Sequence, residues 1–382
     1  MKEGSPISIL PPHRLDLAGH RRHNGVVPWV GYHGDDGRDR LIEAVGSAGL
    51  RGRGGAGFPT AVKLRAARAK RSIVVANGCE GDPLSRKDAV LLTLSPHLVL
   101  DGLQLAAHAI GAVETVLCVH AASPVLPSVH AALAERDDRV PVRVAEIPRR
   151  YVASEETALV RYLTSGDARP LGKVPRPAER GVRGRPTLVS NVETLAQLAS
   201  AILLGPHHYR AARTELVTVT GAVRRPGVVE LPAGSSLAAV LAAAGGEAEP
   251  VQVVLAGGSG GTWTSDLDGG LSGIPAVHAL PARACGLEYT AKVLAFLAAE
   301  SARQCGPCTF GLPSIAADFA ELVRGGPSSA RLARRLPLLT GRGACAHPDG
   351  AARLAESALR VFDADVRTHQ AGGRCRVPAG VA

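Results

Sequence analysis

Apolar residues follow two different spacings in the first half of the chain. They recur at the three-to-four-residue spacing of one face of an α-helix in 39–50, 59–70 and 95–112. The runs 71–78 and 114–121 are short, rich in β-branched residues and bounded by turn signals, which is typical of buried strands. Helices that alternate with buried strands predict an α/β fold with a parallel sheet, and the alternation continues to about residue 205.

The pattern changes near Tyr209. Two short strands there flank a Pro-Gly turn, and a helix and a further strand follow, which predicts a small α+β module. From about Glu288 the helical spacing returns and predicts a small helical domain. The expected layout is an N-terminal extension (1–38), an α/β domain (39–207), the small module (208–280), the helical domain (281–366) and a tail (367–382).

Composition narrows the classes of function. Hydrophobic residues make up 46% of the 382 residues and charged residues 20%, as expected for a folded protein of two or three domains. The net charge of +10 comes from 44 basic residues that are spread along the chain, and aromatic residues are only 3%. Scattered charge without stacking aromatics argues against a nucleic-acid partner and favours a small anionic ligand. The N-terminal stretch has no sustained apolar core and no run reaches membrane-spanning length, so we expect a cytoplasmic protein without membrane insertion.

A glycine-rich loop is the first candidate site. Gly52, Gly54 and Gly57 in "GLRGRGGAGFPT" satisfy G-x-G-x-x-G, whose glycines let backbone amides approach a phosphate at a helix N-terminus. A predicted helix, not a strand, precedes the loop, so an ordinary Rossmann first turn is disfavoured. With Arg51 and Arg53 beside the glycines, the loop is interpreted as an anion nest, the alternative being a flexible turn.

Two acidic segments follow predicted strands. "NGCEGDP" comes directly after the strand at 71–78, which puts Asn77, Glu80 and Asp82 where open α/β sheets bind ligands. "YVASEETAL" places Glu155 and Glu156 after another short β-like start. Either segment alone is also explained by a solvated turn or a helix N-terminal charge.

The blocks "GLRGRGGAGFPT", "NGCEGDP", "YVASEETAL", "GRPTLVSNVETLA" and "ESARQCGPC" carry a resemblance. Their order is similar to that in the NADH-binding flavoprotein subunit of respiratory complex I and its relatives in NAD-linked hydrogenases and formate dehydrogenases. The resemblance covers roughly residues 40–365. It implies a Rossmann-like FMN-binding domain, a ubiquitin-like β-grasp module of the soluble-ligand-binding type, and a C-terminal helical bundle that holds a [4Fe-4S] cluster.

The resemblance also implies roles for individual residues. Glu156 would lie on the nicotinamide side of the flavin as the catalytic residue, and Phe58 would stack on the nucleotide. FMN and NAD(H) would be held by Gly52, Arg53, Gly54, Gly55, Gly57, Phe58, Lys63, Asn77, Glu80, Asp82, Tyr151, Glu155, Glu156, Lys173, Ser190, Asn191 and Thr194.

Several positions depart from the family pattern. Cys79 stands where the family usually has an aspartate, and Ser154 where it has a glycine. Phenylalanines that pack on the adenine of NADH are replaced by Ala66 and Arg176, which predicts weaker stacking unless the arginine compensates.

The expected cluster ligands are incomplete. Ala302 occupies the first position of the family's C-x2-C-x2-C pattern, leaving Cys305, Cys308 and Cys345. Cys375 from the tail is the expected fourth ligand, with His347 or His369 as alternatives, and a zinc site or a vacant site remain open.

The expected function is that of an FMN-dependent, NADH-oxidising electron-transfer flavoprotein. A hydride would pass from NADH to FMN, and single electrons would leave through the cluster to a ferredoxin-like or other electron-transfer subunit. The alternatives are an FMN electron-transfer subunit without efficient NADH use, and a non-catalytic ligand-binding or scaffold protein of the same fold.

Overall fold

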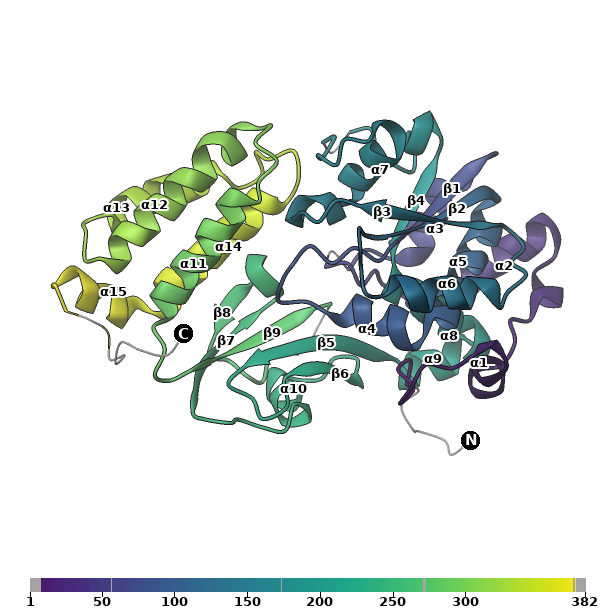
Figure 1. The fold of residues 1–382 in the computed structure, drawn as a ribbon, viewed down its shortest axis with the longest axis horizontal. Coiled ribbons are helices and arrows are strands. Elements are labelled where there is room, and N and C mark those ends of the chain that lie inside the picture. Colours follow the sequence, from purple (N-terminus) through teal and green to yellow (C-terminus); the bar gives the residue numbers. More distant parts are fainter. Residues whose placement is uncertain (1–7, 56, 173, 271–272, 374, 376–382) are drawn as a thin grey trace.

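A four-stranded parallel sheet lies at the centre of the first half of the chain (Figure 1). The computed structural model describes residues 8–55, 57–172, 174–270, 273–373 and 375. The strands have the spatial order β3-β2-β1-β4 and are β1 (Ser72–Asn77), β2 (Ala112–His120), β3 (Val142–Ile147) and β4 (Thr187–Asn191). The parallel α/β arrangement expected from the sequence is thus confirmed.

Helices cover both faces of this sheet. Alternate residues of β1 point to opposite faces, so Val74 joins one hydrophobic core and Val75 the other. The helices of this unit are α2 (Gly34–Ser47), α3 (Thr60–Ala67), α4 (Lys87–Leu94), α5 (Pro96–Ile110), α6 (Leu126–Ala134), α7 (Glu156–Ser165), α8 (Val192–Leu204) and α9 (Pro206–Ala212). Short 3-10 turns lie at Tyr151–Ser154 (η2) and Val182–Gly184 (η3).

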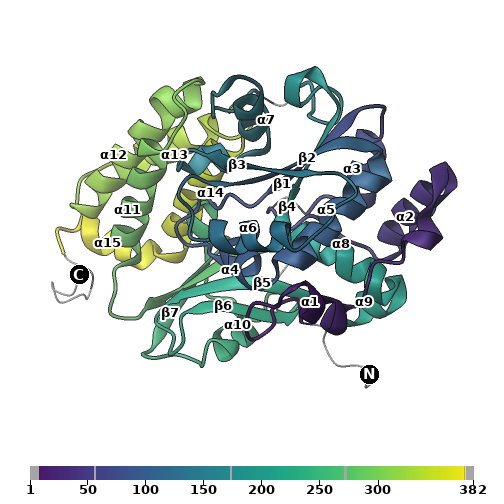
Figure 2. The same ribbon diagram turned by 45° about the vertical axis from the view of Figure 1, so that its right-hand side comes forward.

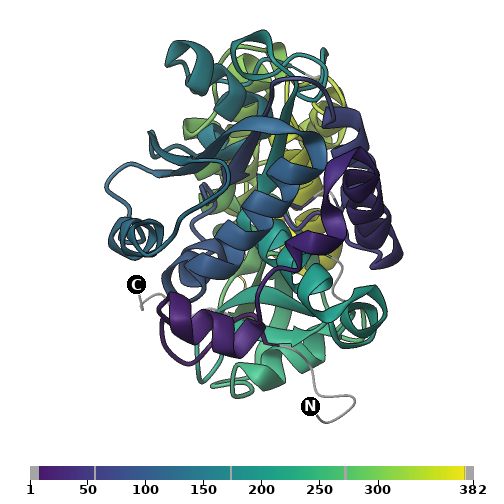
Figure 3. The same cartoon turned by 90° about the vertical axis from the view of Figure 1, so that its right-hand side faces the viewer.

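The N-terminal segment packs against the rest of the molecule. It forms α1 (Leu17–Asn24) and the 3-10 turn η1 (Trp29–Tyr32), and Figure 3 shows it, in purple, along the outside of the α/β unit. The backbone N–H of Ile9 donates to Glu230 on the second sheet at 2.7 Å. The buried hydroxyl of Ser95 donates to the carbonyl oxygen of Ile9 at 2.5 Å. This segment therefore connects the second sheet to the junction between α4 and α5.

A second, five-stranded sheet lies beneath the first unit in the view of Figure 2. Its strands have the order β6-β5-β9-β7-β8 and are β5 (Thr214–Gly221), β6 (Gly227–Pro232), β7 (Val251–Ala256), β8 (Thr262–Thr264) and β9 (Ala276–Pro281). Strands β5 and β9 are parallel, and the other pairs are antiparallel. One helix, α10 (Leu237–Ala243), packs on it, and the turn η4 spans Gly258–Gly260.

The described chain from Gly286 onward is helical, as expected. Figure 1 shows these helices, in light green and yellow, standing beside the two sheets. They are α11 (Gly286–Ala299), η5 (Pro307–Gly311), α12 (Leu312–Val323), α13 (Ser329–Arg335), η6 (Leu336–Leu338), α14 (His347–Val361) and α15 (Asp363–Gln370).

Three expected boundaries fall inside helices and need correction. Residue 39 lies within α2, residue 208 within α9 and residue 367 within α15. Helix α2 begins early because Asp35 and Asp36 occupy its first turn, where negative charge is favourable. A change in sequence pattern shows that a new domain is near, but it does not locate the boundary, because a packed helix can continue across the change.

Among the described residues, no single helix has the length and apolar character needed to cross a membrane. Only α4 and α5 taken together meet those measures, and they are bent by 97°.

Candidate functional site

The glycine loop lies between two helices, α2 and α3, as the sequence predicts. Its neck is closed by two backbone hydrogen bonds: Gly52 N–H donates to Phe58 O and Thr60 N–H donates to Leu50 O, both at 2.9 Å. Arg51 braces the loop by donating to Gly57 O at 2.9 Å. The fold of the loop is therefore set by its own backbone.

The tip of the loop rests on the start of α8, at the carboxyl end of β4. Thr194 Oγ accepts from the backbone N–H of Arg53 at 2.8 Å. A Cβ built on Gly54 would lie 3.6 Å from the Cβ of Asn191, while nothing lies within 4 Å of a Cβ on Gly55. Gly55 also has a φ of +96°, which favours glycine. Bare backbone at a helix N-terminus fits the phosphate of FMN.

Arg53 does not contribute its side chain to this cradle. Its guanidinium is 7% exposed and contacts Glu215 on β5 at 2.6 Å. Burial alone would lower the pKa of Arg53, but the charges of Glu215 and Glu193 outweigh burial and raise it. The expectation that this arginine holds the flavin phosphate is corrected for its side chain, because the charge is committed to the contact between the loop and the second sheet.

Lys63 and Glu156 meet although they lie far apart in the sequence. The Nζ of Lys63, on α3, is 3.1 Å from each carboxylate oxygen of Glu156, the first residue of α7. Both side chains are about one-third exposed, at 30% and 35%. Phe58, on the loop that precedes α3, is 47% exposed. An accessible ring on the loop and a charged pair that begins on the helix after it are suited to a ligand that has both an aromatic and a polar part.

The segment before Glu156 is a 3-10 turn, not the β-like start that we expected. Asn77, at the end of β1, donates from Nδ2 to the carbonyl oxygen of Ser154 at 2.9 Å. A Cβ on Gly81 would lie 2.4 Å from the carbonyl oxygen of Tyr151, so this turn requires glycine for the close approach. Glu155 caps α7 by accepting from Thr157 N–H at 2.9 Å, and burial raises the pKa of Glu155.

Two acidic residues of the "NGCEGDP" segment bind the protein itself. Glu80 accepts from Ser85 Oγ at 2.7 Å and from Ala89 N–H at 2.9 Å. Asp82 accepts from the backbone N–H of Ser259 at 2.7 Å, which joins this turn to η4 of the second sheet. Their carboxylates thus order the edge of the site, and the expected contact of Asp82 with a cofactor is not supported by its orientation. Lys173, also expected at the site, lies outside the described residues.

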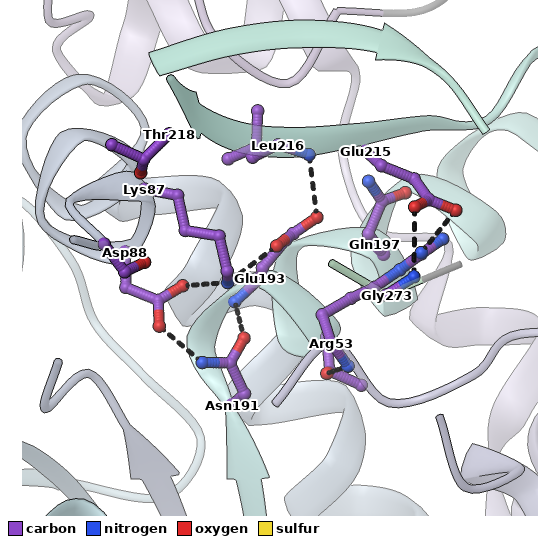
Figure 4. A network of polar contacts seen from close by, with 12 residues as sticks. Arg53, Lys87, Asp88, Asn191, Glu193, Gln197, Glu215, Leu216, Thr218 and Gly273 are labelled. Carbon is purple, nitrogen blue, oxygen red and sulfur yellow. Dashed lines mark hydrogen bonds and ion pairs between the residues drawn. The ribbon is translucent and has the colours of Figure 1, made fainter. Parts of the chain in front are cut away.

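A buried polar network behind the loop was not found from the sequence (Figure 4). Lys87 Nζ lies 2.7 Å from Asp88 and 2.8 Å from Glu193, and Asn191 Nδ2 donates to Asp88 at 2.5 Å. Glu193 accepts from the backbone N–H of Leu216, on β5, at 3.1 Å. Burial alone would lower the pKa of Lys87, but the charges of Asp88 and Glu193 raise it. The block "GRPTLVSNVETLA" contains Asn191 and Glu193, but no local pattern links these residues to Lys87 and Asp88.

Three cysteines gather where the cluster was expected. Burial first, and then Cys305 and Cys345, raise the pKa of the Cys308 thiol to about 12. Burial also raises the pKa of the Cys345 thiol to about 11, with contributions from the charges of Glu155 and Cys305. Cys308 and Cys345 are buried and Cys305 is partly exposed, and three thiols that act on one another are a donor set for an iron–sulfur cluster, which binds them as thiolates. The residues therefore fit a cluster, with one ligand missing at Ala302.

Tyr151 and His347 lie between the flavin side and the cysteines. Their ring centroids are 5.0 Å apart, and Tyr151 also packs on Phe296 of α11. His347 Nε2 lies 2.8 Å from the carbonyl oxygen of Leu297, and its buried Nδ1 has no hydrogen-bond partner within the described part of the chain. An unpartnered buried nitrogen two residues after Cys345 is an available ligand atom.

Cys375 is not part of this group, which corrects the expected ligand set. Its sulfur lies 3.0 Å from His369 Nε2, and these two atoms and the Cys285 sulfur are mutually within 4.8 Å. Cys285 precedes α11 and Cys305 follows it, so the length of a 14-residue helix, about 20 Å, separates the two places. His369, the other distant alternative, is excluded for the same reason.

Three protein-family models match successive parts of the chain. The Nuo51 FMN-binding domain matches residues 45–200, the SLBB domain residues 216–263, and the NADH-ubiquinone oxidoreductase-F iron-sulfur binding region residues 288–369. The first range contains the parallel sheet and the glycine loop, and the last contains Cys305, Cys308 and Cys345.

The chain is similar to proteins of known name over most of its length. The F subunit of NADH-quinone oxidoreductase from Mycobacterium tuberculosis is 31% identical over 88% of this chain and 86% of the relative. An F subunit of NADH-quinone oxidoreductase from Rhizobium meliloti is 29% identical over 88% of this chain and 90% of the relative.

Solved structures agree with these relatives. The NAD+-reducing [NiFe]-hydrogenase in the air-oxidized state matches with a TM-score of 0.82 and 30% identity over 96% of this chain. The H2-reduced state of such a hydrogenase matches with a TM-score of 0.80 and 30% identity over 91% of this chain. The chain spans 69% and 64% of the length of these two hydrogenase chains.

Proposed function

Because the chain belongs to the family of the NADH-quinone oxidoreductase F subunits, we propose that it oxidises NADH with FMN and passes electrons onward through an iron–sulfur cluster. The observation that carries this function is a chain of contacts: α3, which follows the glycine loop, supplies Lys63 to Glu156, and the neighbouring Glu155 lies close enough to act on the Cys345 thiol. When bound, FMN accepts a hydride and releases electrons one at a time.

The chain's own part in the reaction is to position the two ligands. The glycine loop and the first turn of α8 present backbone N–H groups and Thr194 to the FMN phosphate, in the manner of an anion-binding helix terminus. We assign the nicotinamide side to Glu156, with Lys63 holding its carboxylate in place, and nucleotide stacking to the accessible ring of Phe58. Positioning of this kind contributes to catalysis by fixing the reacting atoms at short distance.

The cluster would be held by Cys305, Cys308 and Cys345, with His347 as the fourth ligand in place of the cysteine lost at Ala302. His347 is supported by its unpartnered Nδ1 and by the bond that its backbone N–H makes to the Cys345 thiol. Because Nε2 faces the carbonyl oxygen of Leu297, it must carry the proton in the neutral ring, leaving the Nδ1 lone pair for iron. Histidine ligation raises the reduction potential of a cluster relative to four cysteines.

The protein works with other electron-transfer subunits, as subunits of this family and of NAD+-reducing hydrogenases do. A ferredoxin-like acceptor is our specific proposal for the subunit that takes electrons from the cluster.

The absorption spectrum of the purified protein, before and after anaerobic addition of NADH, tests the function. We expect a visible flavin absorption band that decreases when NADH is added. A second sample receives NADPH in place of NADH for comparison. A flavin band that NADH leaves unchanged would favour an electron-transfer subunit that does not use NADH. Absence of flavin would favour the non-catalytic scaffold, and either result contradicts the proposal.

Iron content tests the fourth ligand separately. We expect about four irons per chain in the parent and a clear loss in His347→Ala, because three thiolates do not complete a cubane. Adding Ala302→Cys to His347→Ala restores the family ligand and should restore the iron. Full iron in His347→Ala alone would remove His347 from the ligand set.

A further inference from the structure

Cys285, His369 and Cys375 form a buried group far from the proposed cluster. Their exposed fractions are 6%, 4% and 7%. They come from the residue before α11, from the last turn of α15 and from the segment that follows α15. The sulfur of Cys375 lies 3.0 Å from His369 Nε2, the sulfur of Cys285 lies 3.6 Å from the same nitrogen, and all three atoms lie within 4.8 Å of one another.

The geometry points to a mononuclear zinc site, and we propose that these three residues bind one Zn²⁺. In tetrahedral zinc with Zn–S of about 2.3 Å and Zn–N of about 2.0 Å, a sulfur and a nitrogen ligand lie about 3.5 Å apart. The Cys285–His369 separation of 3.6 Å already matches that value, and the Cys375–His369 separation of 3.0 Å requires only a small movement. Thiolates on a cubane cluster bind different irons and lie farther apart.

The histidine has the proton arrangement that a metal ligand needs. Its Nδ1 lies 2.6 Å from the carbonyl oxygen of Val323, at the end of α12. A carbonyl oxygen only accepts, so Nδ1 carries the proton in the neutral ring and Nε2 presents its lone pair to both sulfurs. Metal-binding histidines are commonly fixed by such a bond from the second ring nitrogen.

Charge balance also favours a divalent ion at this place. Two thiolates neutralise Zn²⁺, so the occupied site would bury no net charge. Cys285 lies at the N-terminus of α11, a helix of 14 residues, where the backbone N–H of Glu288 donates to its sulfur at 3.4 Å and fixes its orientation. A water molecule as the fourth ligand would complete four-coordination and keep this charge balance.

A disulfide between Cys285 and Cys375 is the competing explanation. It would leave the lone pair of His369 unused and would require an oxidant. Each sulfur also contacts the histidine nitrogen, at 3.0 and 3.6 Å, so all three donor atoms face a common centre, which a disulfide does not require. The site would fasten the segment after α15 to the start of α11, and it is independent of the flavin.

Metal analysis of the full chain, purified with a thiol reductant, tests the site. We expect about one zinc per chain in the parent and less than about a tenth of that in Cys285→Ala and Cys375→Ala, since each removes one of three protein ligands. Cys118→Ala, which removes another buried cysteine from β2, should keep the zinc. Replacement of zinc by Co²⁺ should give thiolate-to-cobalt absorption in the parent and in the Cys305→Ser, Cys308→Ser double variant.

Alkylation of cysteines in the parent protein tests the site even if the variants fail to fold. With zinc bound, Cys285 and Cys375 should resist alkylation, and both should be labelled after a chelator is added. Absence of zinc and of cobalt absorption in the reduced parent would overturn the proposal. So would a Cys285–Cys375 disulfide as the resting state, or cobalt absorption that depends on Cys305 and Cys308.

Discussion

Glu156 shows how a single side chain acquires a role from its neighbours. The residue begins α7, and its carboxylate is held by Lys63 at 3.1 Å from a different helix. In the proposed function, an anchored carboxylate of this kind orients the nicotinamide amide without binding the flavin itself. Loss of its charge should therefore affect NADH more than FMN.

Glu156→Gln is expected to keep its flavin and to lose about tenfold or more in the rate of flavin reduction by NADH, because a hydrogen bond to a charged group contributes about 1.5–3 kcal/mol. Stopped-flow absorbance with measured FMN content gives both quantities. Glu43→Gln, an exposed acid on α2, is the matched control. An unchanged reduction rate in Glu156→Gln would place the nicotinamide elsewhere.

The structure brings the expected site residues together where a motif fixes the backbone, and it separates them where a side chain has a choice of partners. Gly54, Gly55, Asn191 and Thr194 lie around one cradle, as the glycine pattern and the family blocks predict. Arg53 was misread because its partner Glu215 lies 162 positions away, on a strand that no local pattern links to the loop. Cys375 was misread for the same reason, since spacing alone cannot say which end of a helical bundle a tail reaches.

At the scale of elements, the contact between α5 and α8 determines how the parallel sheet is covered. Gly102 of α5 faces the backbone of α8, and a Cβ there would lie 1.8 Å from the carbonyl oxygen of Leu195. Two helices can approach this closely only where a residue has no side chain. Because α8 also supplies Thr194, the crossing helps to fix the phosphate side of the cradle.

Gly102→Ala should lower the free energy of unfolding by about 3 kcal/mol, at the upper end of typical overpacking costs. Gly46→Ala on α2 provides the contrast, since its Cβ would lie 3.6 Å from the Cβ of Ala61, an ordinary contact. It should stabilise the protein by up to about 1 kcal/mol through helix propensity. Urea unfolding of both variants measures the difference in the free energy of unfolding. Equal values for the two variants would mean that α5 and α8 move apart at no energetic cost.

The type of each element, helix or strand, was largely predictable because the spacing of apolar residues indicates which side chains are buried. The predicted helices at 59–70 and 95–112 and the strands at 71–78 and 114–121 agree with α3, α5, β1 and β2 to within a few residues. Helix α1 was not predicted, because it lies in a polar segment whose packing comes from distant residues such as Asp101. The pairing of β5 with β9 likewise depends on long-range contacts.

At the scale of the whole molecule, buried histidines couple stability to pH. His97, 1% exposed on α5, bonds to Glu135 at 3.1 Å and packs on His20 of the N-terminal segment. Burial, together with the charges of His20 and Arg136, lowers the pKa of His97 to about 4. The unfolded chain therefore binds this proton at a higher pH than the folded protein does.

The free energy of unfolding should keep its full value above about pH 6.5 and should decrease as the pH falls toward 4. Protonation of His97 in the unfolded chain should account for up to about 3 kcal/mol of that decrease. Urea midpoints at several pH values across that window measure it. His97→Gln should flatten the dependence, whereas His130→Gln, an exposed histidine on α6, should not. Identical pH profiles for His97→Gln and the parent would contradict this assignment.

The closed neck of the glycine loop has a further consequence for how a ligand arrives. Its hydrogen bonds between Gly52 and Phe58 and between Leu50 and Thr60 join backbone groups of the chain itself, so the closure of the neck does not depend on a ligand atom. The conformational entropy of that backbone is lost during folding and does not oppose binding. Association of FMN should therefore be a single-step encounter whose rate depends on flavin concentration without saturating, and not a slow loop closure.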